Sequence, residues 1–399
     1  MQHNTYWLLN TNNISSEPST PKDCSILIIG SGLTGVSVAH FLYPHEKDLT
    51  IVDCGSENAS YYRNAGHILH GASESYKAMS DIHGREKTKA IFKFSESFCK
   101  ELENTVNLLN IDCDYSKGQY LTVAKDSKEA KELEDSIVLM KEDGFDYNEL
   151  ITDLAEYRIS DNFEAAKVCN LSAQANPAKF RNSLLKDLLK KGVKYHSQKI
   201  KEIDPQADKV IVKYENGTQS THDAVVIAAN AYAPLFSEFF ATRKLIEPFK
   251  GQIITSTIMK DLIPRFQFSM DHGYIYGTTT VDNRFLIGGW RNNVPGGEVG
   301  TYSLEINKAV ELGLKEFVRS NFNLPELDWE YSWSGIMGSS STGLPFIGPT
   351  NSPLVFTCSG CTGYGFGWFH GSAKLLTDIM FGNSLTQGYQ YFNPTKIGR

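Results

Sequence analysis

The first regular pattern in the chain is a short apolar run that ends at glycine. Residues 25–29 are almost wholly apolar, which is typical of a strand buried in a parallel sheet. Apolar positions then recur at helical spacing over residues 33–43 and stop at Pro44, and a second short apolar run follows at residues 49–53. A strand, a helix and a strand within about 30 residues predict a βαβ unit.

Further segments have the apolar periodicity of amphipathic helices. Residues 87–110 place their apolar side chains on one face, and residues 126–143 do the same before Gly144, a residue that favours a helix end. A third segment, residues 177–191, begins with proline, which is favoured in the first turn of a helix. We therefore expect three helices here, the first of them long.

The remainder of the chain is rich in strand-like runs. Residues 193–203, 210–214 and 224–229 predict a strand, a hairpin with an Asn216-Gly217 turn, and a return into the first sheet. Later runs at residues 252–256, 273–279 and 284–288 are interrupted by a helical pattern near residues 303–321. This second group predicts a separate domain on an antiparallel or mixed sheet.

Together the pattern predicts an α/β fold in which a Rossmann-type domain is interleaved with an α+β substrate domain. No flexible linker separates the two parts. We expect the first domain to comprise residues 22–95, 160–235 and 335–399, and the second residues 96–159 and 236–334, after an N-terminal extension of residues 1–21.

Composition excludes several classes of protein. The 399 residues are 41% hydrophobic and 21% charged, as in ordinary globular proteins, and the longest apolar runs are far shorter than the ~20 residues needed to cross a bilayer. A net charge of -7 without a dense basic cluster argues against nucleic acid as a partner. The seven scattered cysteines and the lack of a secretory signal predict a cytoplasmic location, and the oligomeric state stays open.

The turn between the first strand and its helix carries a dinucleotide-binding pattern. Gly30-Ser31-Gly32-Leu33-Thr34-Gly35 is a G-x-G-x-x-G motif, and Asp53 ends the next strand. Such glycines permit a tight turn, allow backbone N–H groups to approach a pyrophosphate and let the helix pack on the strand, while the carboxylate accepts ribose hydroxyls. The motif predicts a bound dinucleotide but does not distinguish FAD from NAD.

Four blocks in order resemble the FAD-dependent D-amino acid oxidase-like oxidoreductases. They are the glycine motif, Tyr62-Arg63-Asn64-Ala65-Gly66-His67, residues 224–232, and Gly343-Leu344-Pro345-Phe346-Ile347-Gly348 followed by residues 360–366. The resemblance covers almost the whole chain and implies FAD as the cofactor. The cofactor contacts it implies, with the glycine motif included, are Gly30, Ser31, Gly32, Leu33, Thr34, Gly35, Asp53, Cys54, Arg63, Asn64, Ala65, Gly66, His67, Ile68, Ile200, Ala229, Asn230, Trp333, Gly335, Gly360, Thr362, Gly363, Tyr364 and Gly365. In that family the C-terminal glycine turn faces the flavin ring, and we expect it to open a helix over residues 373–381.

Within the family, the chain is most similar to the gamma-glutamylputrescine oxidase-like branch. The Tyr6-Trp7 pair, the Arg-Asn-x-Gly block and residues 333–338 carry this similarity. Related amino acid oxidases have carboxylate-binding arginines where this chain has Met337 and Phe366. Because Met and Phe cannot replace a bidentate guanidinium, an amine is the favoured substrate, with Arg291 as the group that could still bind a carboxylate.

The chemistry that the resemblance implies is oxidation of a C–H bond beside nitrogen, with hydride transfer to flavin N5 and hydrolysis of the imine product. We expect oxygen as the acceptor. His67, Tyr276, Met337 and Tyr364 are the candidate catalytic residues, and Tyr274 and Trp333 are further candidates for the pocket. Lys250 and Lys260 could assist oxygen reduction, although an ordinary surface charge is the simpler interpretation of each.

Several alternatives remain open at this point. A D-amino acid or glycine-type oxidase or dehydrogenase would use Arg291, a non-catalytic FAD-binding protein would keep the fold, and an NAD-dependent dehydrogenase would share only the first βαβ unit. His67, Cys358 or Cys361 could attach FAD covalently, but a hydrogen-bonding or packing role is the simpler interpretation. Cys358 and Cys361 lack partners for a zinc site, a redox disulfide is a minor alternative, no metal is expected, and His370 predicts a local polar contact.

Overall fold

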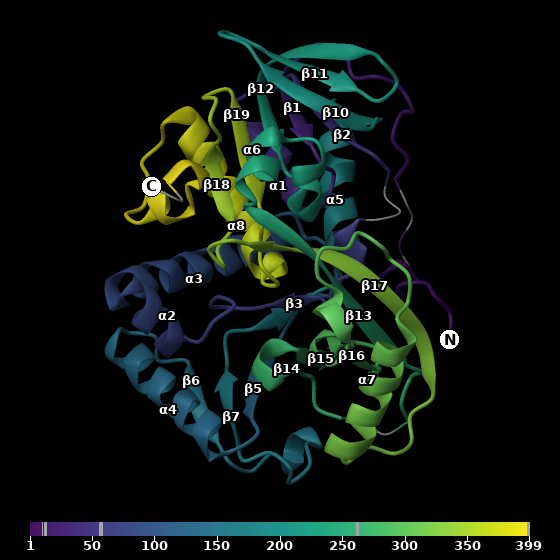
Figure 1. The fold of residues 1–399 in the computed structure, drawn as a ribbon, viewed down its shortest axis with the longest axis vertical. Helices are drawn as coiled ribbons and strands as arrows, with labels where there is room; N and C mark the ends of the chain where they lie inside the picture. Colours follow the sequence, from purple (N-terminus) through teal and green to yellow (C-terminus); the bar gives the residue numbers. More distant parts are fainter. Residues whose placement is uncertain (10, 12–13, 56–58, 261–262, 397–399) are drawn as a thin grey trace.

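A computed structural model describes residues 1–9, 11, 14–55, 59–260 and 263–396 of the chain. Its strands form two large sheets, one above the other in Figure 1, with helices α3 and α8 between them. The helices are α1 (Leu33–Leu42), α2 (Tyr76–His83), α3 (Arg85–Leu108), α4 (Ser127–Glu142), α5 (Pro177–Lys190), α6 (Glu238–Arg243), α7 (Lys308–Asn321) and α8 (Gly365–Phe381).

The first sheet contains the predicted βαβ unit. Its order is β10-β11-β12-β1-β2-β9, with β19 beside β12 and β18 beside β19. Ile28 of β1 lies between Ile51 of β2 and Val226 of β12 in parallel register, so the glycine turn opens at the carboxyl edge of the sheet. The strands are β1 (Cys24–Ile29), β2 (Leu49–Asp53), β9 (Lys194–Ser197), β10 (Ile200–Pro205), β11 (Val210–Tyr214), β12 (Gln219–Ile227), β18 (Phe346–Pro349) and β19 (Val355–Ser359).

The second sheet is mostly antiparallel, as predicted. Its order is β17-β13-β16-β15-β14-β5-β7-β6, and only the pairing of β14 with β5 is parallel among the described strands. The strands are β5 (Gln119–Ala124), β6 (Asn148–Ile151), β7 (Ala165–Cys169), β13 (Ile246–Ser256), β14 (Phe266–Met270), β15 (Ile275–Thr279), β16 (Phe285–Gly289) and β17 (Trp329–Ser340).

Alternation along these strands separates two faces. Phe268, Phe285 and Ile287 face a core that α7 completes, while Tyr276 and Trp333 lie on the opposite face. A small sheet adjoins that second face. It consists of β3 (His67–Ile68), β8 (Ala173–Gln174) and β4 (Ser116–Lys117), and the Thr278 hydroxyl of the large sheet donates to Gln174 of β8. The second face of the large sheet therefore borders the functional site.

The predicted elements differ from the observed ones mainly at their ends. Helix α8 begins at Gly365 rather than Ala373, and α7 begins at Lys308 because the Asn307 side chain caps it by accepting from Ala309 N–H. The run 193–203 forms two strands, since β9 pairs with β2 while β10 turns to pair with β11. The early start of α8 places its N-terminus directly at the glycine turn.

Three further findings bear on the sequence predictions. No helix in the described part of the chain is both long and apolar enough to cross a membrane. Over the same described ranges, no group of three or more His, Cys, Asp and Glu side chains is arranged to hold a metal ion. Each of the seven cysteines is a free thiol.

Candidate active site

The glycine motif forms a tight turn with open space at its centre. A Cβ atom on Gly35 would lie 1.8 Å from the carbonyl oxygen of Gly30, so helix α1 packs against the turn as the motif predicts. At Gly32, in contrast, a Cβ would meet no atom within 4 Å. No side chain caps the N-terminus of α1. The first-turn N–H groups, including those of Leu33 and Thr34, thus lack helical partners at a place where a phosphate fits.

The carboxylate of Asp53 is held beside this turn by a buried polar network. Its Oδ1 accepts from Gly55 N–H at 2.8 Å, and its Oδ2 accepts from the Ser31 hydroxyl. The Arg181 guanidinium, almost fully buried, donates to the Ser31 carbonyl at 2.8 Å and to the Ser31 hydroxyl at 2.7 Å. The Tyr195 hydroxyl lies 3.0 Å from the same Ser31 hydroxyl. Arg181 and Tyr195 carry no motif, so sequence reasoning missed both.

The Arg63 block and the strand β17, which are far apart in sequence, lie in direct contact. Arg63 donates from Nη1 to the Ser334 carbonyl at 2.8 Å, and the Trp333 indole donates to the Arg63 carbonyl at 3.1 Å. A Cβ on Gly335 would lie 2.9 Å from the Cβ of Arg63, so a larger residue there would displace the block. The structure thereby brings together three residues that the resemblance assigned to one site.

The residues after Arg63 form a turn that leads into β3. The Asn64 side chain donates to the carbonyls of Ser60 and Tyr61 at 3.2 Å each and accepts from Gly66 N–H at 2.8 Å. Ala65 is buried in the cluster that contains Trp333. The Asn64 side chain is therefore used within its own turn, and it orients the backbone that carries the following residues.

A second glycine turn, after β19, meets the end of β12. The Asn230 side chain accepts from Gly360 N–H at 2.9 Å and from Cys361 N–H at 3.4 Å, and Thr362 N–H donates to the Gly338 carbonyl at 3.1 Å. A Cβ on Gly363 would meet nothing within 4 Å. Helix α8 starts next at Gly365 without a side-chain cap. A second uncapped helix N-terminus is thus available to an electronegative group.

His67 belongs to β3 of the small sheet, and its side chain lies against the second face of the large sheet. Its ring is edge-on to Tyr276 and Tyr120, with ring centroids 6.4 and 6.3 Å away. Burial lowers the pKa of His67 to about 4, although a backbone hydrogen bond with Gly277 opposes this shift. Its Nε2 is buried and has no hydrogen-bond partner among the residues that the structure describes. His67 is therefore a neutral imidazole at pH 7 with a free nitrogen inside the site.

Tyr276 and Met337 meet over two glycines. The Tyr276 ring crosses Gly288, and its hydroxyl lies 3.0 Å from the position of a Cβ on Gly251. The Met337 methyl lies 2.5 Å from that same position. Two of the predicted catalytic residues, from β15 and β17, therefore adjoin each other, and glycine on the intervening strands leaves the room that they occupy.

Tyr364 lies beside Tyr120, a residue that the sequence analysis missed. The hydroxyl of Tyr364 interacts with that of Tyr120 on β5, and burial raises the pKa of Tyr364 well above the ordinary value. Tyr120 is also the ring neighbour of His67. Its only signal in the sequence is its position in an alternating strand. Tyr120 thus links the predicted residues His67 and Tyr364.

A buried amide on β14 is a second residue that sequence reasoning missed. Gln267 is 1% exposed, and within the described part of the chain neither its Oε1 nor its Nε2 has a hydrogen-bond partner. It is in register with Tyr120 on one side and Thr278 on the other, so the three side chains share a face. A buried amide without partners is costly, which makes Gln267 a candidate for contact with a bound molecule.

Arg291 follows β16 and reaches the edge of this site. Its guanidinium stacks on Phe249 and Tyr274, with ring centroids 4.6 and 4.9 Å away, and donates to the Gly297 carbonyl at 3.1 Å. Burial raises the pKa of Tyr276 to about 12, and the charge of Arg291 opposes this rise. Among the described residues no carboxylate forms an ion pair with Arg291. A cation without a carboxylate partner therefore lies near Tyr276.

The structure contradicts the surface-charge interpretation of Lys250. Its side chain is 8% exposed, forms a 2.8 Å ion pair with Glu298 and donates to the Glu305 carbonyl at 3.0 Å. Because side chains alternate along β13, Lys250 points away from the face on which Gly251 and Met337 lie. The loop that covers this far side of the strand shields Lys250 from solvent. Lys260 is exposed, as the simpler interpretation predicted.

The remaining predicted residues fall into two groups. His370 is buried and bonds to Ser37 and Thr105 at 2.8 Å each, which confirms a local polar contact. Phe366 is buried in the main core. The other predicted residues lie around the first glycine turn and the second, with Ile68 and Ile200 buried, Cys54 exposed, and Cys358 and Ala229 beside the second turn.

These features together fit an FAD molecule. The open position at Gly32 and the uncapped start of α1 suit the pyrophosphate, and the Asp53 carboxylate stands beside them for the ribose. The uncapped start of α8 offers N–H donors and the unpartnered Nε2 of His67 offers a polar atom, both of which are groups that a flavin ring could contact. The donor set therefore matches the cofactor that the resemblance implies.

The chain is similar in sequence to known flavin-dependent proteins. A family model described as "FAD dependent oxidoreductase" matches residues 25–379. The D-amino acid dehydrogenase of Granulibacter bethesdensis is 21% identical over 410 residues, which cover 90% of this chain and 96% of that protein. The D-amino acid dehydrogenase of Rhizobium johnstonii is 27% identical over 205 residues, and this chain spans about half of its length, 48%.

Solved structures share the fold over nearly the full length. The glycine oxidase of Geobacillus kaustophilus has a TM-score of 0.78 at 18% identity, covering 94% of this chain and 99% of that one. The L-proline dehydrogenase of P. horikoshii has a TM-score of 0.75 at 18% identity, covering 94% and 98%. At this level of identity the likeness establishes the fold, in agreement with the predicted architecture.

Proposed function

The chain belongs to the DAO family of FAD-dependent oxidoreductases, and from this premise we propose that it oxidises the C–N bond of an amino acid. The observation that carries this proposal is the position of Arg291. Its guanidinium is stacked on Phe249 and Tyr274 and has no carboxylate partner among the described residues. Its positive charge opposes the rise that burial causes in the pKa of Tyr276. The similarity to the D-amino acid dehydrogenases of Granulibacter and Rhizobium supports the same substrate class.

We assign the cofactor to the two glycine turns and the segment between them. The first turn and Asp53 would hold the adenosine and pyrophosphate, and the second turn with the start of α8 would hold the flavin ring. Residues 63–68 would run along the flavin. When bound, FAD accepts the hydride that leaves the carbon beside nitrogen. This assignment rests on the fit of the donor groups and on the order of the motifs in the family.

The protein groups around the reacting carbon would select and orient a neutral amine. His67 is a neutral imidazole at neutral pH, and in the tautomer with its proton on Nδ1 its Nε2 would accept a hydrogen bond from the substrate amine. Tyr276 stays protonated and would donate through its hydroxyl. The apolar Met337 side chain lies next to Tyr276 and would help to keep water away from the amine. A dry pocket of this kind favours the uncharged amine that hydride transfer requires.

Arg291 would provide the carboxylate contact that the family arginines supply elsewhere. A guanidinium forms two parallel hydrogen bonds with a carboxylate, and stacking on Phe249 and Tyr274 fixes the plane in which it does so. Its Nη1 bond to the Gly297 carbonyl leaves other N–H groups for a ligand. The substrate would thus lie with its carboxylate toward β16 and its amine toward His67.

A second candidate is an amine without a carboxylate. It is favoured by Met337 and Phe366, which stand where related oxidases have arginines, and Phe366 is committed to the core. In this case Arg291 would bind no part of the substrate. The two candidates share the cofactor and the chemistry, and they differ only in the group next to the reacting carbon.

The test is an anaerobic absorbance titration of the purified protein. Amino acids of both configurations are compared with their decarboxylated amines and their amides, and air is then admitted. We expect amino acids to bleach the oxidised flavin band and air to restore it. Bleaching by the amines alone would select the second candidate, and a colourless protein that takes up no added FAD would overturn the assignment as a whole.

Arg291→Met supplies the matched control in the same experiment. For an amino acid the KM is expected to rise about 100-fold, which corresponds to about 2.7 kcal/mol and is typical of a lost charge-assisted contact. The KM for the corresponding amide should change far less. Equal KM values for the wild type and the variant would contradict the carboxylate role.

A further inference from the structure

The first residues of the chain form a strap across the large sheet. The backbone of Gln2 pairs with β17, donating to the Glu330 carbonyl at 2.8 Å and accepting from Ser332 N–H at 3.0 Å. The N-terminus accordingly lies beside β17 in Figure 1. The strap, residues 2–8, continues into the short helix η1 (Tyr6–Leu8). Its start is thus fixed to the edge strand of the substrate sheet.

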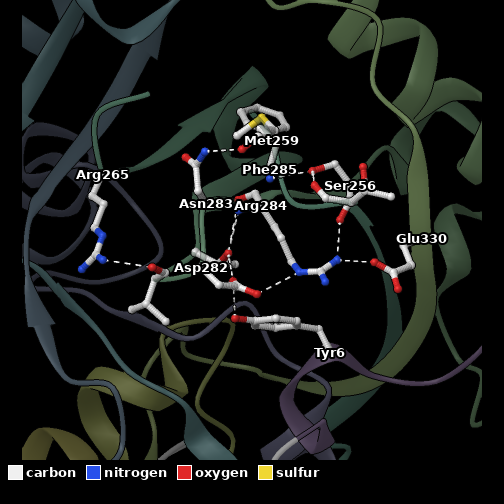
Figure 2. A network of polar contacts seen from close by, with 12 residues as sticks. Tyr6, Ser256, Met259, Arg265, Asp282, Asn283, Arg284, Phe285 and Glu330 are labelled. Carbon is white, nitrogen blue, oxygen red and sulfur yellow. Dashed lines mark hydrogen bonds and ion pairs between the residues drawn. The ribbon is translucent and has the colours of Figure 1, made fainter. Parts of the chain in front are cut away.

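Tyr6 joins the strap to the hairpin between β15 and β16. Its hydroxyl donates to Asp282 at 2.6 Å, and Arg284 holds the same carboxylate through Nε at 2.9 Å (Figure 2). Arg284 also donates to the Ser256 carbonyl at 2.9 Å and pairs with Glu330 of β17. Two strands of the substrate sheet, β13 and β17, and the turn between β15 and β16 therefore share one polar network with Tyr6.

Trp7 joins the strap to the segment that we assign to the flavin. Its indole N–H donates to the Asn64 carbonyl at 2.7 Å. Its ring lies against Gly66, where a Cβ would be 2.7 Å from the indole Cη2. Trp7 is 5% exposed and packs with Tyr61, Tyr62 and Trp333. The backbone of residues 64–66 is therefore positioned by Trp7 on one side, as that of Arg63 is by β17 on the other.

We propose that Tyr6 and Trp7 are positioning residues for the flavin, through which the substrate sheet sets the place of residues 63–68. The Asn64 side chain makes its hydrogen bonds within its own turn and does not fix that turn to the rest of the protein. The position of the turn therefore depends on neighbouring residues. Trp7 contacts it at the Asn64 carbonyl and at Gly66, directly before His67. A change at Trp7 is thus transmitted to the flavin side and to the imidazole.

The test compares Trp7→Phe and Tyr6→Phe with Tyr157→Phe in the full-length protein loaded with FAD. Trp7→Phe removes the indole donor but keeps an aromatic ring, and Tyr6→Phe removes the bond to Asp282. Tyr157→Phe is a matched control, because its hydroxyl also donates at 2.6 Å to a side-chain oxygen, that of Gln119. The readouts are the visible absorbance bands, the flavin midpoint potential and the dissociation constant for FAD.

We expect Trp7→Phe to shift the absorbance bands and the midpoint potential and to raise the dissociation constant about tenfold. Tyr6→Phe should produce the same changes with a smaller amplitude, and Tyr157→Phe should produce none. If Trp7→Phe fails to fold, the Tyr6→Phe comparison decides the question. A lower melting temperature with unchanged bands, potential and affinity would overturn the proposal, since the strap would then act on stability alone.

This inference rests on the assignment of residues 63–68 to the flavin, which His67→Ala tests separately. If His67→Ala shifts the flavin bands and the strap variants do not, the assignment holds and the strap proposal is wrong. If neither His67→Ala nor the strap variants shift the bands although FAD binds, the assignment itself is wrong. The two failures are therefore distinguishable in one set of spectra.

Discussion

The hydroxyl of Tyr276 and the methyl group of Met337 meet at the backbone of Gly251. Both lie within 3.0 Å of the position that a Cβ of residue 251 would occupy. The two side chains come from different strands, β15 and β17, and the two strands between them, β13 and β16, carry glycine at this point, Gly251 and Gly288. The shape of the proposed substrate wall therefore depends on the absence of a side chain at these two positions.

Gly251→Ala tests this wall. The added Cβ would displace the flexible Met337 side chain and press on Tyr276, so we expect the fold to persist while the rate of anaerobic flavin reduction falls about tenfold. Gly118→Ala is the control, because its Cβ would approach no atom closer than 3.8 Å. Equal reduction rates for Gly251→Ala and the wild type would place the substrate elsewhere.

The roles of the second and third glycines of the motif, Gly32 and Gly35, are separable by experiment. Gly32→Ala fills open space, so the melting temperature of the FAD-free protein should stay near that of the wild type while FAD affinity falls at least tenfold, about 1.4 kcal/mol. Gly35→Ala would place a Cβ 1.8 Å from the Gly30 carbonyl and should lower the melting temperature itself. Unchanged FAD binding by Gly32→Ala, measured by fluorescence titration, would contradict the pyrophosphate site.

His67 makes the stability of the fold depend on pH. Its pKa of about 4 in the folded protein lies below the ordinary value of about 6.5, so between these pH values the unfolded chain binds the extra proton. The contribution is present above pH 6.5 and is lost as the pH falls toward 4. His67→Gln should reduce the slope of unfolding free energy against pH in this window, by up to about 1.4 kcal/mol per pH unit.

Urea unfolding of the FAD-free protein at several pH values between 4.5 and 7 measures this slope. His70, whose pKa is also lowered to about 4 by burial, should keep its own contribution in the variant. Parallel stability curves for His67→Gln and the wild type would show that the pKa of His67 does not shift on folding, which would contradict its burial as a neutral imidazole.

Gln267 offers a contrast between stability and binding. Its amide is buried without partners, so Gln267→Met removes an unsatisfied polar group at similar volume and should leave the melting temperature equal or higher. If the amide binds substrate, the same variant should raise KM several-fold. A steady-state assay beside a thermal melt checks both, and a lower melting temperature with unchanged KM would assign the amide a structural role.

Local sequence was sufficient for the parts of the fold that depend on neighbours in the chain. The first βαβ unit, the glycine turn and helices α3, α4 and α5 follow from apolar period, proline and glycine, because these act within a few residues. The same reasoning missed the ends of α7 and α8. The Asn307 cap and the start of α8 at the second glycine turn determine those ends.

Only part of the candidate site could be predicted from local sequence patterns. The motifs indicated Asp53, His67 and Tyr364, but not Tyr120, Gln267 or Arg181, which stand alone in ordinary-looking segments. Alternation in a strand shows that two residues share a face, yet it does not show which strand lies beside them or what covers that face. Residues without a motif become functional candidates only when the sheet places them next to others.

The sequence by itself determined the dinucleotide-binding motif and the Rossmann unit, since each depends on short-range spacing, and the order of its motifs carried the family resemblance that implies FAD. Tertiary structure decided that Arg63 rests on Gly335, that Trp7 holds the turn at Gly66, and that Lys250 is buried in an ion pair with Glu298. These contacts join segments far apart in the chain. Their energies depend on burial and on the distance between side chains, which no local pattern of residues specifies.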